Sequence, residues 1–140
     1  MTPGTILGHE AVGIVVATGA AVTTRAEGDR VLVSCISSCG RCRFCKEARY
    51  GLCTGGGWIL GHTTDDVQAE LARIPFADTS LYKVPEQLSD VFATHRFELG
   101  ETEAAYEVFA NAGTNDALKV VLSAHPVHLE PHAAQRLVTA

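Results

Sequence analysis

Short runs of apolar residues, broken by turn residues, dominate the first two thirds of the chain. Val12–Ala17 is a β-branched run that ends at Thr18-Gly19-Ala20, which is typical of a buried strand followed by a turn. Val67–Ile74 alternates apolar and polar positions, as a half-exposed strand does. The pattern predicts strands at Val12–Ala17, Arg30–Ser34, Val67–Ile74, Leu81–Val84 and Ala117–Leu122.

One segment late in the chain has helical spacing instead. Between Glu101 and Asn111, the side chains of Ala105, Val108 and Phe109 fall on one stripe, and Gly113 follows as a stop signal. The predicted fold class is therefore mainly β with one late helix.

Four cysteines, Cys39, Cys42, Cys45 and Cys53, follow the pattern C-x2-C-x2-C-x7-C. The two-residue gaps bring three thiols around a tight turn, and the longer gap returns the fourth. Four thiolates suit tetrahedral Zn2+, and a site closed by four protein ligands is structural and not catalytic. Disulfide bonds or unrelated buried thiols are the alternative, but an odd total of five cysteines and the lack of a secretory segment favour the metal.

Composition describes an ordinary globular domain. The 140 residues are 46% hydrophobic and 19% charged, which allows one domain with a buried core. A net charge of −5 argues against nucleic acid or an anionic membrane as partner. The local basic cluster Arg41–Arg49 is expected to favour thiolates at the zinc site. No apolar stretch approaches a bilayer span and no leader follows Met1, so the predicted location is the cytoplasm.

Several motifs resemble the zinc-dependent medium-chain alcohol dehydrogenases. The motifs are Gly8-His9-Glu10-Ala11-Val12-Gly13, Gly28-Asp29-Arg30-Val31, the four cysteines, Trp58-Ile59-Leu60-Gly61 and Gln68-Ala69-Glu70. The likeness resumes at Thr94-His95-Arg96-Phe97 and runs to about Ser123, which resembles the C-terminal end of the same family. It implies a partial, truncated GroES-like barrel over residues 1–124, with a zinc lobe at 35–57 and a family C-terminal segment at 94–124. Residues 125–140 form a histidine-containing tail beyond it.

The resemblance also indicates which parts of the family's fold are missing here. The family's nucleotide-binding domain would fall between Asp90 and Thr94, where three residues stand, and no G-x-G-x-x-G occurs in the sequence. The first strands of the family's barrel would lie before Met1. We therefore expect no Rossmann domain and no NAD(P) binding.

From the family's catalytic zinc site, the resemblance carries over His9 as a direct ligand and Glu10 as an outer or exchangeable ligand. Three protein ligands are the norm for such a site. If the fold brings His62 near His9, the three residues complete a His2Glu set with an open position, which lowers the pKa of bound water to about 7. The alternative is that His9 is an ordinary polar residue at a strand start, in which case no second Zn2+ is held there.

Two other polar segments have simpler interpretations. Asp65, Asp66 and Glu70 flank a turn and are expected to be solvated turn residues. The tail after Ser123 carries three histidines and is expected to be flexible or bound to a partner, with a metal clamp as the alternative. A short helix over Glu130–Leu137 is a further alternative for this tail.

The leading functional prediction is a zinc-binding domain derived from a zinc-dependent alcohol dehydrogenase, not competent for NAD(P)-dependent hydride transfer. One alternative is a small hydrolase of activated esters or phosphoesters that uses metal-bound water near His9 and Glu10. The other is a residual alcohol dehydrogenase; either enzyme would have a small-molecule substrate. Loss of the opening strands would leave Val12–Ala17 as a bare edge, so a homo-oligomer, in the simplest case a two-fold dimer, is expected. Folding back of the tail is the competing outcome.

Overall fold

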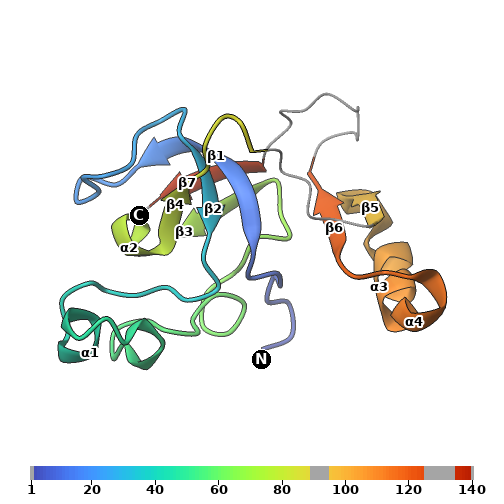
Figure 1. Ribbon diagram of the computed structural model, residues 1–140, viewed down its shortest axis with the longest axis horizontal. Helices are drawn as coiled ribbons and strands as arrows, with labels where there is room; N and C mark the ends of the chain where they lie inside the picture. The colour runs from blue at the N-terminus through green and yellow to red at the C-terminus, as the bar shows by residue number, and fades with distance from the viewer. Residues whose placement is uncertain (1, 89–94, 125–134, 140) are drawn as a thin grey trace.

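A five-stranded sheet forms the larger part of the molecule. The computed structural model describes residues 2–88, 95–124 and 135–139. The strands lie in the order β3-β7-β1-β2-β4, with β1 (Ala11–Thr18) in the centre (Figure 1). The other strands are β2 (Arg30–Val33), β3 (Leu71–Ile74), β4 (Leu81–Lys83) and β7 (Gln135–Thr139). The sheet is therefore open, with β3 and β4 at its edges, and the partial barrel expected from the sequence is confirmed in this form.

The core of the molecule is one face of this sheet. Val15, Val31, Val33, Ile74 and Leu81 are each at most 1% exposed. Along β2, the exposed Leu32 separates the two buried valines, as the alternation of a strand with one buried face requires. Each such side chain contributes about 1.5–3 kcal/mol when it is buried. The strands predicted at Val12–Ala17, Arg30–Ser34 and Leu81–Val84 are thus confirmed to within two residues.

The C-terminal tail returns to the sheet as β7. This strand runs parallel to β1 on one side and to β3 on the other, with Leu137 opposite both Val15 and Ala72. The bare edge expected at Val12–Ala17 is therefore wrong, because the tail covers it within the same chain. The alternative of a helix over Glu130–Leu137 is wrong for residues 135–137, which are extended; residues 130–134 and the three tail histidines lie outside the described residues.

Strand β3 is shorter than the sequence pattern predicts, since it begins at Leu71 and not at Val67. The reason is a competing partner for the backbone. The amide of Val67 donates to the Gly8 carbonyl at 3.0 Å, and the amide of Gln68 donates to the Leu7 carbonyl at 2.9 Å. These bonds fasten the segment that precedes β1 across the start of the predicted strand.

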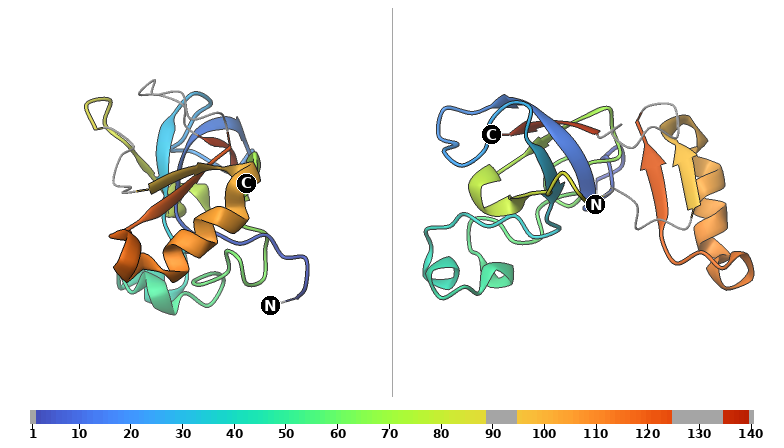
Figure 2. Two further views of the ribbon diagram at one scale, coloured as in Figure 1. Left: turned by 90° about the vertical axis from the view of Figure 1, so that its right-hand side faces the viewer. Right: turned by 45° about the horizontal axis from the view of Figure 1, so that its top comes forward.

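A second, smaller unit lies beside the sheet (Figure 2). Its two strands, β5 (His95–Glu98) and β6 (Val120–Ser123), pair in parallel. Three helical segments connect them, namely η2 (Leu99–Glu101), α3 (Thr102–Ala110) and α4 (Ala112–Asn115). The late helix is confirmed as α3, but Gly113 does not act as its stop, because it lies inside α4. Within the described residues, polar contacts of Gln68 with Tyr106 and of Lys119 with Glu10 join this unit to the sheet side.

No helix in the described part of the chain is long and apolar enough to cross a membrane. Residues 95–124 supply a single parallel strand–helix–strand unit, and the structure over its described ranges contains no doubly wound Rossmann sheet.

Candidate metal centre

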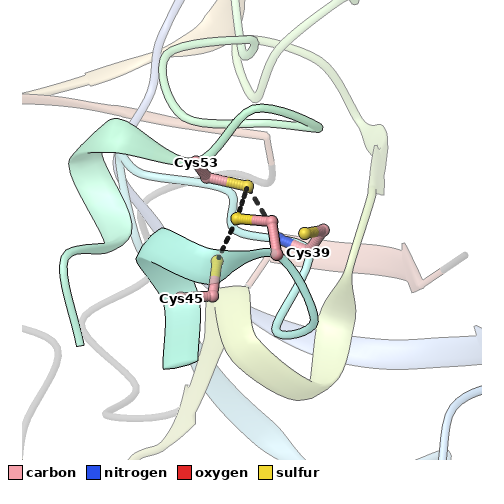
Figure 3. A group of neighbouring side chains, drawn as sticks. Cys39, Cys45 and Cys53 are labelled. Carbon is pink, nitrogen blue, oxygen red and sulfur yellow. Dashed lines mark hydrogen bonds between the residues drawn. The ribbon is translucent and has the colours of Figure 1, made fainter. Parts of the chain in front are cut away.

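The four cysteines lie on a loop between β2 and β3 that contains the short helices α1 (Arg43–Lys46) and η1 (Tyr50–Leu52). Their Sγ atoms all lie within 4.8 Å of one another (Figure 3). The Sγ of Cys42 is 3.5 Å from that of Cys45 and 4.0 Å from that of Cys53. A tetrahedron of thiolates at the usual Zn–S distance has edges of about 3.8 Å. The observed spacing therefore fits a four-thiolate zinc site, and all five cysteines of the chain are free, as this requires.

The loop folds back on itself at Gly56 and Gly57, and any side chain at Gly56 would displace the neighbouring backbone. Gly57 and Ser37 form a two-way backbone bridge, with the Ser37 amide 2.9 Å from the Gly57 carbonyl. A β-carbon on the neighbouring Gly56 would stand 2.2 Å from the Ser37 carbonyl oxygen, which is far inside contact distance. Glycine at this position thus lets the segment that carries Cys53 return to the segment that carries Cys39.

The cysteine thiols differ in their readiness to ionise, and the leading causes are local. Backbone amides of Cys45 and Thr54 lower the pKa of Cys42 to about 6. Amides of Arg41 and Cys42 lower the pKa of Cys39 as well. Burial raises the pKa of Cys45 to about 12, so this thiol needs a cation beside it to ionise at neutral pH. Zn2+ bound to the four sulfur atoms would supply that charge.

The basic residues around the cysteines have partners of their own. Arg43 pairs with Glu47 at 2.9 Å, and Arg49 lies 3.8 Å from the same carboxylate. The Arg49 guanidinium also lies over the ring of Phe44, 5.7 Å from its centroid. The positive charge expected to favour the thiolates is therefore partly neutralised by Glu47, and backbone amides are the leading influence on Cys39 and Cys42.

The second metal site predicted at His9, Glu10 and His62 stays a prediction. All three side chains are exposed. Glu10 forms an ion pair with Lys119 at 2.8 Å, and this hydrogen bond and charge lower the pKa of Glu10. Within residues 2–88, 95–124 and 135–139, the four cysteines form the one group of three or more His, Cys, Asp or Glu ligands that converge within 4.8 Å.

Sequence reasoning missed the burial of Asp66. It was expected to be a solvated turn residue, but its side chain is 2% exposed and neither carboxylate oxygen has a hydrogen-bond partner. Its neighbour Asp65 is exposed and accepts a hydrogen bond from the Ile6 amide at 3.0 Å. The segment before β1 covers Asp66, because the Asp66 amide donates to the Ile6 carbonyl at 3.2 Å. No local sequence signal distinguishes the two aspartates, since the covering segment is about 60 residues away along the chain.

Comparisons with known proteins agree with this geometry. Residues 1–86 match the family model of the alcohol dehydrogenase GroES-like domain. A medium chain reductase/dehydrogenase of an Acremonium species is 36% identical over 137 residues, which cover 90% of this chain and 45% of that protein. A glutathione-independent formaldehyde dehydrogenase of Pseudomonas aeruginosa is 32% identical, with coverage of 98% and 37%.

Solved structures point the same way. The apo form of zinc dependent alcohol dehydrogenase 2 from Streptococcus pneumonia superposes with a TM-score of 0.57 at 28% identity, covering 90% of this chain and 48% of that one. The chain thus spans less than half the length of these relatives. With its open sheet, its four-cysteine lobe and a family match over most of its length, the chain belongs to the alcohol dehydrogenase GroES-like domain family.

Proposed function

We propose that this chain is a zinc-stabilised domain whose four-cysteine lobe holds a structural Zn2+ ion and which does not itself transfer hydride. The structural zinc site is supported by the convergence of the four Sγ atoms within 4.8 Å. The lobe has few buried apolar side chains apart from its cysteines: Tyr50 is 43% and Leu52 is 50% exposed. Metal binding therefore supplies much of the free energy that orders this loop.

The proposal that the chain does not transfer hydride is supported by the turn between β5 and α3. In dinucleotide-binding units, a glycine-rich turn and free backbone amides at the start of the helix bind the pyrophosphate. Here Glu98 and Glu101 form a capping box, with the Glu101 carboxylate 2.9 Å from the Glu98 amide. Glu103 adds a third carboxylate to the first turn of α3. These groups occupy the amides and repel phosphate.

Calorimetric titration of the zinc-loaded chain with NADH and NADPH tests whether the chain binds a nicotinamide nucleotide. We expect no stoichiometric binding at micromolar concentrations of the chain. A Glu98→Gln, Glu101→Gln variant is the matched control, because it removes the two charges and keeps the side-chain shape. Stoichiometric micromolar binding of either nucleotide to the unaltered chain would contradict the proposal.

Hydrolysis at His9 and Glu10 is the second candidate. One observation favours it, because the buried Asp66 carboxylate lies near enough to the His9 imidazole for the two to interact electrostatically. A carboxylate that orients a metal-binding imidazole accepts a hydrogen bond from it; Asp66 accepts none within the described structure, so only its charge acts on His9. Lys119 is a competitor, since it occupies the Glu10 carboxylate. Any ester hydrolysis should therefore be lost on mild chelation before the structural zinc is removed, and it should rise in Lys119→Ala and fall in His9→Ala. Full activity in His9→Ala would remove this site from consideration.

A further inference from the structure

Strand β3 is one edge of the five-stranded sheet. It pairs in parallel with β7 on one side, and within residues 2–88, 95–124 and 135–139 no strand pairs with its other side. In a parallel ladder, alternate residues direct their amide and carbonyl groups to opposite sides of the strand. Some backbone groups of Leu71–Ile74 therefore point away from β7, and such groups are a template for a further extended chain.

A cavity of about 990 Å3 lies at this unpaired edge. Leu71, Ala72 and Arg73 all line it, together with residues of the segment before β1 and of the turn at 62–66. The exposed Leu71 and Arg73 lie on one face of the strand and the buried Ala72 lies on the other. A cavity that touches residues of both faces must lie beside the strand, and β7 already occupies one of the two sides.

The segment before β1 does not fill this place. It binds the chain just ahead of β3, where the Gln68 amide donates to the Leu7 carbonyl at 2.9 Å and the Val67 amide donates to the Gly8 carbonyl at 3.0 Å. Strand β3 begins only at Leu71, beyond these bonds. The volume is at the upper end of the range for small-molecule sites, about 300–1,000 Å3, so a short peptide has room there.

The exposed side chains of β3 indicate which peptide fits. Leu71 is 56% exposed, and Arg73 is exposed and has no hydrogen-bond or ion-pair partner in the described part of the chain. Asp65 also lines the cavity, but it accepts a hydrogen bond from the Ile6 amide, and the Asp66 oxygens are buried. Cross-strand neighbours on one face are two residues apart, so a matching strand has an aliphatic residue for Leu71 and an acidic residue for Arg73.

We propose that the cavity beside β3 binds an extended peptide, which adds a strand to this edge and carries an aliphatic and an acidic residue two positions apart. In this mode of recognition, main-chain hydrogen bonds provide affinity and the alternate side chains provide specificity. A second copy of this chain fits less well, because both edge strands carry a basic residue, Arg73 on β3 and Lys83 on β4, and neither strand carries an acidic one. The proposal does not depend on a second metal at His9 or on any hydrolytic activity.

The test is a titration of the zinc-loaded chain with the blocked pentapeptide Thr-Val-Thr-Glu-Thr, followed by 1H–15N NMR at residues 71–74. A few exposed hydrogen bonds and one charge pair correspond to a Kd of roughly 0.1–1 mM at low salt. We expect saturable shifts and slower hydrogen exchange at the β3 amides that face away from β7. The peptide Thr-Val-Thr-Lys-Thr differs only in its charge and should bind about fivefold more weakly or worse.

N-methylated peptides test strand pairing itself. A strand paired along one edge uses the amides of alternate residues only, and N-methylation removes those donors. Of two Thr-Val-Thr-Glu-Thr peptides that are N-methylated at the two alternate sets of positions, one should bind about tenfold more weakly and the other should bind as before. Equal loss or equal retention of binding by the two peptides would overturn the proposal.

An arginine variant tests the side-chain preference. Arg73→Gln should bind the Glu and Lys peptides within about twofold of each other, because it removes the charge that distinguishes them. Arg96→Gln makes the same change on an exposed arginine of β5 and should keep the preference.

Three further results would each contradict the proposal. They are an unchanged preference in Arg73→Gln, shifts with acetate equal to those with the peptide, which indicate a simple anion site, and concentration-dependent protection of the β3 amides without peptide, which indicates a second copy at this edge. If Arg73→Gln does not fold, the two N-methylated peptides on the unaltered chain decide the matter.

Discussion

Individual side chains of the zinc lobe differ in what they contribute to the metal centre. Cys42 is central in the cluster, since its Sγ lies near those of both Cys45 and Cys53. Backbone amides already favour its thiolate, whereas the buried Cys45 needs the metal before it ionises. The geometry therefore predicts that removal of one ligand affects both metal affinity and local order.

Replacing Cys42 by Ser should lower the zinc content and loosen residues 46–57. Structural zinc contributes about 10–16 kcal/mol to such sites, so losing one of four ligands should cost about 3 kcal/mol or more of lobe stability. Hydrogen exchange at residues 46–57, together with zinc analysis, measures both effects. Cys35→Ser is the matched control, because Cys35 is free, half-buried and outside the cluster. A Cys42→Ser chain with full zinc and unchanged exchange would contradict the assignment.

Asp78, in the short helix α2 (Ala77–Ser80), holds the turn that follows β1. Its carboxylate accepts hydrogen bonds from the backbone amides and hydroxyls of Thr23 and Thr24, at 2.7 to 3.1 Å. These bonds hold the pKa of Asp78 well below its usual range. A carboxyl group whose pKa is lowered in the folded state stabilises the fold above its unfolded pKa of about 3.9, and this stabilisation is lost as pH falls further.

Asp78→Asn should therefore lower the free energy of unfolding by about 1–2 kcal/mol at neutral pH. The difference from the unaltered chain should be constant between about pH 5 and 8 and should shrink only below about pH 4. Urea unfolding at several pH values measures it. Glu27→Gln, which alters an exposed carboxyl group, should have little effect. A difference that grows as pH falls from 8 to 5 would refute the assignment.

At the scale of a residue, the sequence predicted the contacts that are local and missed those that are not. The cysteines lie within 15 residues of one another, so their spacing alone brings the thiols together. The burial of Asp66 depends on the segment around Ile6. The pairing of Glu10 depends on Lys119, which is 109 residues away. Whether these groups are buried or paired is decided by the tertiary fold.

Among the elements, the strands with a buried face could be predicted and β7 could not. Val31 and Val33 alternate with polar or exposed positions, and this pattern is a property of the strand itself. Strand β7 follows a tail with prolines and histidines, and it is extended because β1 and β3 provide partners on both sides. Strand pairing between distant segments leaves little signal in local sequence.

The central place of β7 leads to a test at one residue. Val138 pairs with Ala17 on β1 and with Arg73 on β3, so a proline there removes a backbone donor between two partner strands. Val138→Pro should cost about 3 kcal/mol or more, seen as a fall of roughly 10 °C in Tm. Val138→Thr is β-branched, keeps the amide, and should stay near the unaltered Tm. Equal Tm values for the two variants would show that β7 does not pair as described.

The whole molecule leaves apolar side chains uncovered along one edge of the sheet. Leu32 and Tyr82 lie opposite each other on β2 and β4 and are 44% and 53% exposed. Because β7 covers the edge of β1, the predicted homo-oligomer depends on the exposed face formed by Leu32 and Tyr82 and on the edge strand β4.

We predict that the chain forms a two-fold dimer through this face. Light scattering should give the mass of two chains at concentrations on the order of tens of micromolar. A Leu32→Lys, Tyr82→Lys double variant should give one chain, and Leu88→Lys, which changes an exposed leucine just beyond β4, serves as the control. A one-chain mass for the unaltered protein would show that β7 and the second unit close the molecule without a partner.

We propose that one structural zinc, held by four cysteines, orders the lobe. Elemental analysis of purified chain, coupled to hydrogen exchange at residues 46–57 before and after strong chelation, tests it most directly. We predict one zinc per chain and loss of exchange protection in the lobe when the metal is removed. A metal-free chain that keeps the protection of residues 46–57 would contradict the claim.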